Sequence, residues 1–230
     1  MRYELHVLGM MSAASSSIQI QLAAQAKRTL RQSVFDLKQL LSKWSQINTE
    51  STAHVNTTAS YLIELELSKA ASNWLPSVHS IPKLQSKHEQ KLKSRLQDGG
   101  LSLLSEKYIV QFRKISDKIN ELEHIVGRAA VSEHLDEAVK VVKNMGFGRF
   151  HELFKEVAAM YRKEVELKEG IVVDLLSTIS DTTSCKDEDN GDGSSTMNMI
   201  TVRSSAWFHQ PYIDETRCSA VCEALEYQIE

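Results

Sequence analysis

An apolar stripe that repeats in steps of four and three residues constrains the fold of this chain more than any other feature. Charged side chains such as Arg113, Asp117 and Glu121 occupy the other faces of the same stretch. A stripe sustained over about three heptads is typical of a helix that packs against other helices along its length. The pattern therefore predicts a coiled coil or a helical bundle. The stripe consists of Tyr108, Phe112, Ile115, Ile119, Leu122, Val126 and Ala129.

A second stripe with the same spacing lies nearer the start of the chain and predicts a helix over residues 20–48. A weaker pattern over residues 50–74 predicts another helix, although its β-branched threonines lower the helix propensity. A turn near residues 48–52 would let the two helices face each other as a hairpin. The second stripe consists of Leu30, Val34, Leu37, Leu41 and Trp44.

A third apolar pattern follows the glycines of GFGRF at residues 146–150 and extends to Ile179. Its apolar face is wide, so we expect this helix to contact more than one neighbour. Helices of about 30 residues are about 45 Å long and need other helices alongside them. The predicted fold class is all-α, with long antiparallel helices that form a coiled-coil hairpin or bundle. Part of the apolar seam would remain uncovered and available to a partner chain.

Prolines and composition divide the chain into segments. The only prolines are Pro76, Pro82 and Pro211, and proline interrupts helices. An acidic run rich in Gly, Ser and Thr cannot offset the entropy of ordering and predicts a flexible linker. The expected organisation is a disordered leader over residues 1–19, a helical coiled-coil body over 20–178 with a break near 75–100, the acidic linker over 179–199, and an aromatic motif with a short helix over 200–230.

The composition disfavours several classes of protein. The formal net charge is −3, which provides no overall positive field for nucleic acid. The chain has an odd number of cysteines, and all of them lie late in the sequence: Cys185, Cys218 and Cys222. This pattern differs from the cysteine framework of a disulfide-rich secreted domain. No apolar run approaches the eighteen or so residues of a membrane span. We therefore expect a protein of a reducing compartment that does not span a membrane.

No residue pattern predicts catalysis, a metal or a cofactor. His209, Cys218 and Cys222 could be imagined as zinc ligands, but two cysteines on a short amphipathic helix more often serve as small apolar residues. The GFGRF sequence lacks the Lys-Ser/Thr of a phosphate-binding loop. No nucleophile elbow or catalytic triad pattern is present. The chain is predicted to be a non-enzyme without cofactors.

Two further segments invite a binding function. The basic segment KLQSKHEQKLKSR at residues 83–95 could contact phosphates. It has no interleaved aromatic residues for base stacking, which favours a solvated helix face. The segment WFHQPYI at residues 207–213 offers Trp207, Phe208 and Tyr212 as large anchors beside Pro211. It either folds back on the helical body or fills a groove on another protein, and its sequence does not discriminate between these two.

The motif MYRKEVELK at residues 160–168, followed by WFHQPYID at 207–214, resembles the cyclin-dependent kinase 2-interacting protein family. The segment LKQLLSKWSQIN at residues 37–48 adds weaker agreement. The acidic insertion between the motifs departs from the family pattern, and residues 1–19 and 76–100 match none of it. The matching positions are Met160, Tyr161, Arg162, Lys163 and Glu164, and then Trp207, Phe208, His209, Gln210, Pro211 and Tyr212.

The resemblance implies a nuclear adaptor, with the cytoplasm as an alternative location. It implies links to cyclin-dependent replication kinases and checkpoint signalling after DNA damage. It also implies an AAA-type ATPase complex that acts in large ribosomal subunit maturation and replisome protein turnover. In such a complex the chain would pair with a helical partner protein, which favours a hetero-oligomer over a homo-oligomer. No proline follows Ser or Thr, so a proline-directed kinase would meet a binder and not a substrate.

Within the resemblance, Trp207 and Tyr212 are expected to be packing anchors, and His209 and Gln210 to bond nearby groups. Two other functions stay open from the residues alone. One is a self-associating coiled-coil structural protein, which needs no special tail. The other is a weak nucleic-acid-binding module that uses residues 83–95 and binds in a salt-dependent manner.

Overall fold

The computed structural model describes the backbone of residues 2–69, 74, 81–130, 143–184 and 193–229. Side chains are described for residues 21–69, 74, 81, 83–129, 143–179 and 195–229. Over this part of the chain the structure is almost entirely helical and contains no strand. The predicted all-α fold class is therefore confirmed for the described residues.

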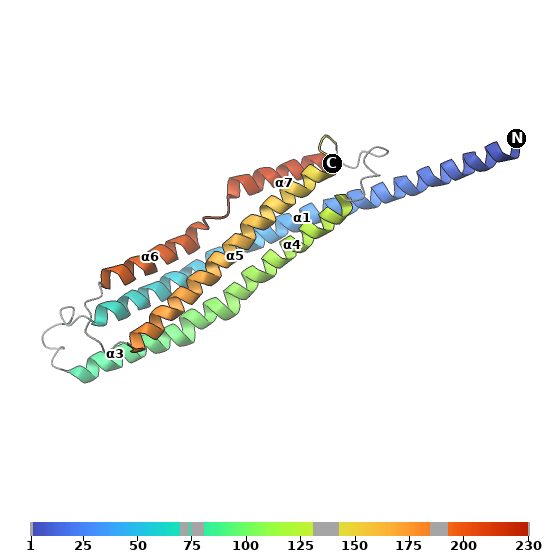
Figure 1. Cartoon of the computed structure of the whole chain (residues 1–230). Helices are drawn as coiled ribbons and strands as arrows, with labels where there is room; N and C mark the ends of the chain where they lie inside the picture. Colours follow the sequence, from blue (N-terminus) through green and yellow to red (C-terminus); the bar gives the residue numbers. More distant parts are fainter. Residues whose placement is uncertain (1, 70–73, 75–80, 131–142, 185–192, 230) are drawn as a thin grey trace. The chain divides into compact units, whose positions relative to one another are not determined.

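The helices have the following bounds (Figure 1). They are α1 (Arg2–Lys69), α3 (Pro82–Arg95), the π-helical turns η2 (Leu96–Leu101) and η3 (Leu103–Ile109), α4 (Val110–Ala130), α5 (Phe147–Ser184), α6 (Gly193–His209) and α7 (Glu215–Ile229). Pro82 occupies the first turn of α3, where its missing N–H would have no intrahelical partner in any case.

The helix boundaries differ from those expected. The prediction of a hairpin turn near residues 48–52 is wrong, because α1 continues through this stretch to Lys69. Ser51 and Thr52 both donate hydroxyl hydrogen bonds to the carbonyl oxygen of Asn48, at 3.0 and 2.8 Å. Hydroxyl side chains are tolerated inside a helix when they bond to the preceding turn in this way.

The predicted segment limits also shift. Residues 2–19, expected to be a disordered leader, belong to helix α1. The break expected near residues 75–100 ends earlier, because α3 already begins at Pro82. The acidic linker expected over residues 179–199 is shorter, because α5 extends to Ser184 and α6 begins at Gly193. Its central residues 185–192 lie outside the described residues.

The chain divides into two compact units. Unit 1 comprises Met1–Ser42, Ser116–Tyr161 and Ile213–Glu230. Within its described part, the guanidinium of Arg31 donates to the carbonyl of Ile229 at 3.0 Å, and Lys38 pairs with Glu226 at 2.7 Å. Since the numbers rise on one helix as they fall on the other, α1 and α7 are antiparallel here. The core includes Leu30, Val34, Leu37, Ile119, Leu122, Val126, Phe150, Phe154, Val157 and Leu225, all buried.

Unit 2 comprises Lys43–Ile115 and Arg162–Tyr212. The ring of Trp44 packs against that of Phe112 with centroids 4.5 Å apart, and the ring of His54 against that of Tyr108 at 5.3 Å. These pairs show that α1 is antiparallel to the segment that leads into α4. The core of this unit includes Trp44, Ile47, Val55, Leu62, Leu96, Leu104, Tyr108, Phe112, Val172, Leu175, Ile200 and Trp207.

The structure corrects the expectation that part of the apolar seam remains uncovered. Of the two predicted stripes, only Leu41 and Ala129 are partly exposed. The other members are buried within the chain: Leu30, Val34, Leu37, Trp44, Tyr108, Phe112, Ile115, Ile119, Leu122 and Val126. The expectation of an uncovered seam did not include packing against helices α5, α6 and α7 of the same chain. The burial of these stripes therefore does not require a second chain.

Candidate functional site

The aromatic motif at residues 207–212 spans the end of helix α6. The helix ends at His209, two residues before Pro211, because the ring of a proline disfavours helical geometry at the preceding residue. Gln210 has a φ of 49°, the one positive value among described residues other than glycine. Its N–H still donates to the carbonyl of Ala206 at 3.2 Å. This left-handed residue redirects the chain at the end of α6.

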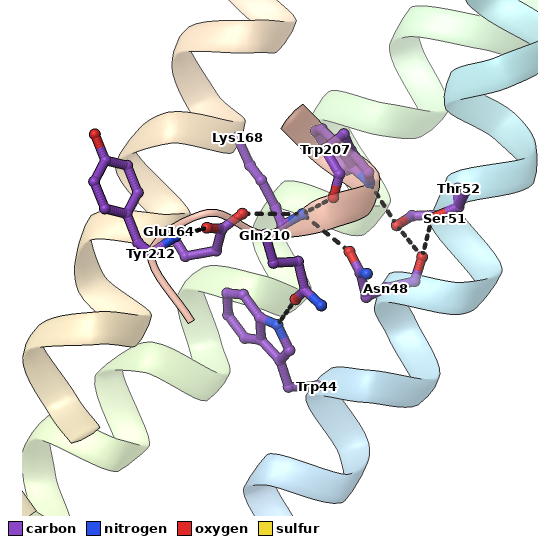
Figure 2. A network of polar contacts seen from close by, with 9 residues as sticks. All are labelled: Trp44, Asn48, Ser51, Thr52, Glu164, Lys168, Trp207, Gln210 and Tyr212. Carbon is purple, nitrogen blue, oxygen red and sulfur yellow. Dashed lines mark hydrogen bonds and ion pairs between the residues drawn. The ribbon is translucent and has the colours of Figure 1, made fainter. Parts of the chain in front are cut away.

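Trp207 is fully buried in unit 2. Its indole N–H donates to the hydroxyl oxygen of Ser51 on α1 at 3.0 Å (Figure 2). Its ring meets that of Phe112 edge to face, with centroids 5.9 Å apart. The tryptophan therefore joins α6 to α1 by one polar contact and to the start of α4 by an apolar one.

Gln210 makes a second bond of the same type. Its side-chain oxygen accepts a hydrogen bond from the indole N–H of Trp44, and both residues are buried. The two indole N–H groups of this cluster are thus both satisfied, which removes the cost of burying them. The strained backbone of Gln210 is held in place by this contact.

Lys168 of α5 lies at the centre of the cluster with no exposed surface. Its ammonium donates to the side-chain oxygen of Asn48 at 2.9 Å and to the carbonyl of Trp207 at 2.8 Å (Figure 2). It also lies 4.5 Å from the ring centre of Trp207 and 5.1 Å from that of Phe112. These contacts replace the water that an ammonium would otherwise retain.

Glu164 supplies the compensating charge one helical turn earlier. Its Oε1 lies 3.4 Å from the Lys168 ammonium, and neither side chain is exposed; the distance suits an ion pair, but this oxygen has no well-aligned hydrogen bond. Its Oε2 accepts the backbone N–H of Tyr212 at 3.2 Å. The carboxylate thus connects α5 to the residue that follows Pro211.

Burial shifts the pKa values of this pair in opposite directions. It lowers the pKa of Lys168 to about 8, with the nearby Glu164 charge acting against that shift. It raises the pKa of Glu164, opposed by the Lys168 charge and by the Tyr212 N–H. Both shifts favour the neutral forms, as expected when a charged group loses its water.

We call Trp44, Asn48, Ser51, Glu164, Lys168, Trp207 and Gln210 the buried polar cluster. Its members come from α1, α5 and the end of α6, all within unit 2. Because its cationic, amide and hydroxyl groups are directed at one another and away from solvent, the cluster is suited to holding helices together. A charged network of this type selects one register of the helices, since a shifted register would leave buried groups unpaired.

The structure brings some of the predicted motif residues together and leaves others at the surface. Glu164, Trp207 and Gln210 are buried in the cluster, whereas Phe208 and Tyr212 are 56% and 48% exposed. His209 is also exposed, with its ring 4.9 Å from that of Phe208. Pro211, Arg162 and Lys163 are exposed as well. The expectation that Tyr212 and Trp207 act alike is therefore corrected: only Trp207 is a packing anchor.

Met160 and Tyr161 belong to unit 1 and not to the cluster. The thiol of Cys218 on α7 lies 3.8 Å from the sulfur of Met160. Tyr161 is buried, which raises the pKa of its phenol. Nearby, Arg217 binds Glu156 with two hydrogen bonds of 2.7 and 2.8 Å. These contacts attach α7 to the first half of α5.

Sequence reasoning missed Asn48, Ser51 and Lys168 as parts of the site. A signal existed for Lys168, because it lies four residues after Glu164 and between Val165 and Val172, on the wide apolar face of α5. A charged pair on an apolar face indicates buried partners elsewhere. Asn48 and Ser51 carry no such signal, since polar residues occur on every surface helix.

The two described cysteines have the surroundings of structural thiols. Cys218 and Cys222 are both buried and free. Burial raises the pKa of Cys218 to about 11 and also raises that of Cys222. The described residues contain no group of three or more His, Cys, Asp or Glu side chains placed to hold a metal ion. Among the helices described, none is long and apolar enough to cross a membrane.

Comparison with known proteins adds no relative. Neither the protein-family models nor the curated protein sequences compared with this chain gave a match.

Proposed function

We propose that this chain is a non-enzymatic adaptor subunit similar to the cyclin-dependent kinase 2-interacting protein family. The observation that carries the proposal is the meeting of the two resemblance motifs. Glu164 and Lys168 of MYRKEVELK bond to the backbone of Tyr212 and Trp207 in WFHQPYID, at 3.2 and 2.8 Å. The parts of both motifs that lie in unit 2, residues 162–168 and 207–212, are thus bonded to each other, which supports a shared role for the two motifs.

The outward side of the same motif suits the binding of a partner. Phe208, His209 and Tyr212 are exposed beside residues that are held rigidly from within. Aromatic side chains on a rigid base make strong interface anchors because little entropy is lost when they are covered. The buried polar cluster would therefore position this outer aromatic surface, defined by Phe208, His209 and Tyr212, for a second protein.

The resemblance supplies the identity of the partners. They are a helical partner protein, an AAA-type ATPase and a cyclin-dependent kinase, in a nuclear setting of replication, checkpoint signalling and ribosome maturation. In this proposal the chain is not a long antiparallel coiled-coil hairpin with an open apolar stripe, as first expected. It consists of compact units in which the apolar stripes are covered within the chain. Partner binding would then use surface groups and not an open heptad stripe.

The experiment separates the inward and outward sides of the motif. The tagged chain is purified from its native cells, and co-purified proteins are identified by mass spectrometry for wild type, Phe208→Ala/Tyr212→Ala and Trp207→Ala. Loss of the buried Trp207 is expected to lower the free energy of unfolding by about 3–5 kcal/mol. The exposed pair is expected to change it by less than about 1 kcal/mol, and chemical denaturation followed by circular dichroism measures both.

An adaptor is supported if a helical protein and an AAA-type ATPase co-purify with the wild-type chain. At least one of these two proteins should then be lost with the stable Phe208→Ala/Tyr212→Ala variant. The matched control is Val202→Ala, which removes another exposed apolar side chain of α6, 64% accessible, and should leave recovery unchanged. Recovery of the chain alone, with every variant, would exclude the proposal.

A further inference from the structure

A second feature of unit 2 is a cleft between α1 and the junction of α3 with η2. Its volume is about 470 Å³, and its walls include His54, Thr58 and Tyr61 from α1 and Arg95, Asp98 and Gly100 from the facing segment. Clefts of roughly 300–1,000 Å³ are the size that takes small molecules. None of these residues belongs to the buried polar cluster, so the cleft is independent of the proposed adaptor surface.

Thr58 contributes an unpartnered polar atom to this cleft. Its side chain is fully buried, and its hydroxyl has no hydrogen-bond partner among the described residues. Other hydroxyls of α1, such as those of Thr57 and Ser60, donate to the carbonyl four residues earlier at 2.9 and 2.8 Å. A buried hydroxyl that lacks this usual bond and lines a cleft is a group available to a ligand.

The facing wall is a π-helical turn, which brings its backbone close to Thr58. Gly100 lies in this turn and is buried. A Cβ at this position would lie 2.8 Å from the Thr58 hydroxyl oxygen, so any larger residue would push the hydroxyl aside. π-helical turns occur often at functional sites because they displace side chains from the regular helical ladder.

The cleft contains both hydrogen-bond donors and one carboxylate acceptor. The Arg95 guanidinium lies 5.7 Å above the ring of Tyr61 and forms no ion pair within the described chain. The His54 ring packs against Tyr108, with ring centroids 5.3 Å apart and the planes tilted by 37°. Asp98 accepts a hydrogen bond from Ser94 at 2.8 Å and, as a carboxylate, can accept further bonds from hydroxyl groups.

The surrounding charge favours an anion. Helix α3 carries Lys83, Lys87, Lys91 and Lys93 in addition to Arg95, against the single acidic residue Glu89. Its four lysines have no carboxylate within ion-pair distance in the described structure. These lysines do not line the cleft, but they give the helix that supplies Arg95 a net positive charge, which attracts anions toward it.

We propose that this cleft binds a small phosphate ester that also carries hydroxyl groups, the class that includes sugar phosphates and nucleoside monophosphates. Arg95 and the Thr58 hydroxyl donate to the phosphate oxygens, His54 adds a donor from the opposite wall, and Asp98 accepts a hydroxyl of the ligand. A guanidinium matches the oxygens of a phosphate in spacing and charge.

Isothermal titration calorimetry of the full chain tests this assignment, with ribose 5-phosphate, adenosine monophosphate and, as the compound without phosphate, adenosine. We expect saturable binding of at least one phosphate ester and binding of adenosine that is at least about tenfold weaker. Vesicles that contain a monophosphorylated phosphatidylinositol, used in a sedimentation assay, distinguish a lipid headgroup from a soluble ester as the source of the phosphate.

Two variants and one control locate the binding site. Arg95→Gln should weaken binding by about tenfold or more, because a charge-assisted bond is lost. Thr58→Val should weaken it several-fold without lowering the unfolding temperature, since the hydroxyl has no partner in the folded chain. Lys118→Gln makes the same charge change on an exposed residue of unit 1 and should have no effect.

Three results would overturn the proposal. The first is no saturable binding of either ester or of the vesicles up to about 10 mM phosphate. The second is equal binding of adenosine and adenosine monophosphate, which would remove the phosphate from recognition. The third is equal weakening by Arg95→Gln and Lys118→Gln, which would mean attraction to general charge only.

Discussion

At the scale of single residues, Lys168 and Glu164 are the most informative pair. Each is fully buried, and each bonds to a segment far away in sequence: Lys168 to Asn48, separated by 120 residues, and Glu164 to Tyr212, separated by 48. The attraction within a buried pair roughly offsets the loss of water, so removing one partner is far more costly than removing both.

The first prediction follows from this asymmetry. Lys168→Met should lower the free energy of unfolding by about 3–5 kcal/mol, because Glu164 then remains buried without compensation. The double variant Lys168→Met/Glu164→Gln should recover most of that loss. Urea denaturation followed by circular dichroism measures both values. A double variant that is less stable than Lys168→Met alone would contradict a compensating ion pair.

A second prediction concerns pH. The pKa of Lys168 is lowered to about 8 from 10.5, so between these pH values the unfolded chain holds more protons than the folded chain, and the free energy of unfolding rises with pH. The raised pKa of Glu164 acts the other way at lower pH, where stability falls as pH increases from about 4.5. We expect wild type to gain on the order of 2 kcal/mol between pH 7.5 and pH 10, relative to the double variant.

Measurement against the double variant is essential for this prediction. Tyr161, Cys218 and Cys222 have raised pKa values, and groups of that kind lower stability as pH rises above their unfolded values. They are unchanged in Lys168→Met/Glu164→Gln, so their contribution cancels in the difference between the two proteins. A difference that is constant from pH 7.5 to pH 10 would show that Lys168 titrates normally.

At the scale of elements, α7 shows how a short helix is attached. Cys218, Val221, Cys222 and Leu225 form its buried side, while the Arg217–Glu156 and Lys38–Glu226 pairs lie at its edges. The apolar spacing of α7 predicted a helix with cysteines as small core residues. Its contacts with α1 and α5 explain why those cysteines have raised pKa values and no metal-binding geometry.

A third prediction follows for the reactivity of these thiols. In a Cys185→Ser background, Cys218 and Cys222 should react with a disulfide reagent at pH 8 at least about a hundredfold more slowly in native protein than in urea-unfolded protein. The reason is twofold: both thiols are buried, and their raised pKa values leave little thiolate. The absorbance of the thiol that is released from the reagent gives the rate of reaction. Native and unfolded rates within a factor of about three would mean that α7 detaches readily.

At the scale of the whole molecule, the main change from expectation concerns the apolar stripes. Each stripe alone suggested that a second chain was needed, yet all their residues except Leu41 and Ala129 are buried by the chain's own helices. Two compact units, each with its own core, divide this burial between them. A self-associating coiled coil would instead require a stripe that remains open.

The fourth prediction is therefore that the purified chain is a monomer of 25.9 kDa at micromolar concentration. Size-exclusion chromatography with light scattering measures the mass directly. Leu41→Glu, which places a charge at a partly exposed stripe position, should leave that mass unchanged. A stable dimer that Leu41→Glu dissociates would favour the self-associating alternative over the adaptor proposal.

The sequence by itself determined the helical class and the residues that form the apolar stripes, and it singled out Trp207 as a candidate anchor. Helix periodicity is a local property, because side chains three and four residues apart share a face whatever the rest of the chain does. The same local pattern predicted long helices over most of the described residues, and it failed at residues 48–52 because hydroxyl groups there bond to the helix itself.

Only the tertiary structure decided which polar groups are satisfied and by which partners. Gln210 meets Trp44 across 166 residues of sequence, and Trp207 meets Ser51 across 156. No spacing rule predicts such pairs, since they depend on how the helical segments of unit 2 are aligned. The separation of the aromatic motif into buried Trp207 and exposed Phe208 and Tyr212 has the same origin: a helix end has several faces, and only packing against other helices decides which of them is excluded from water.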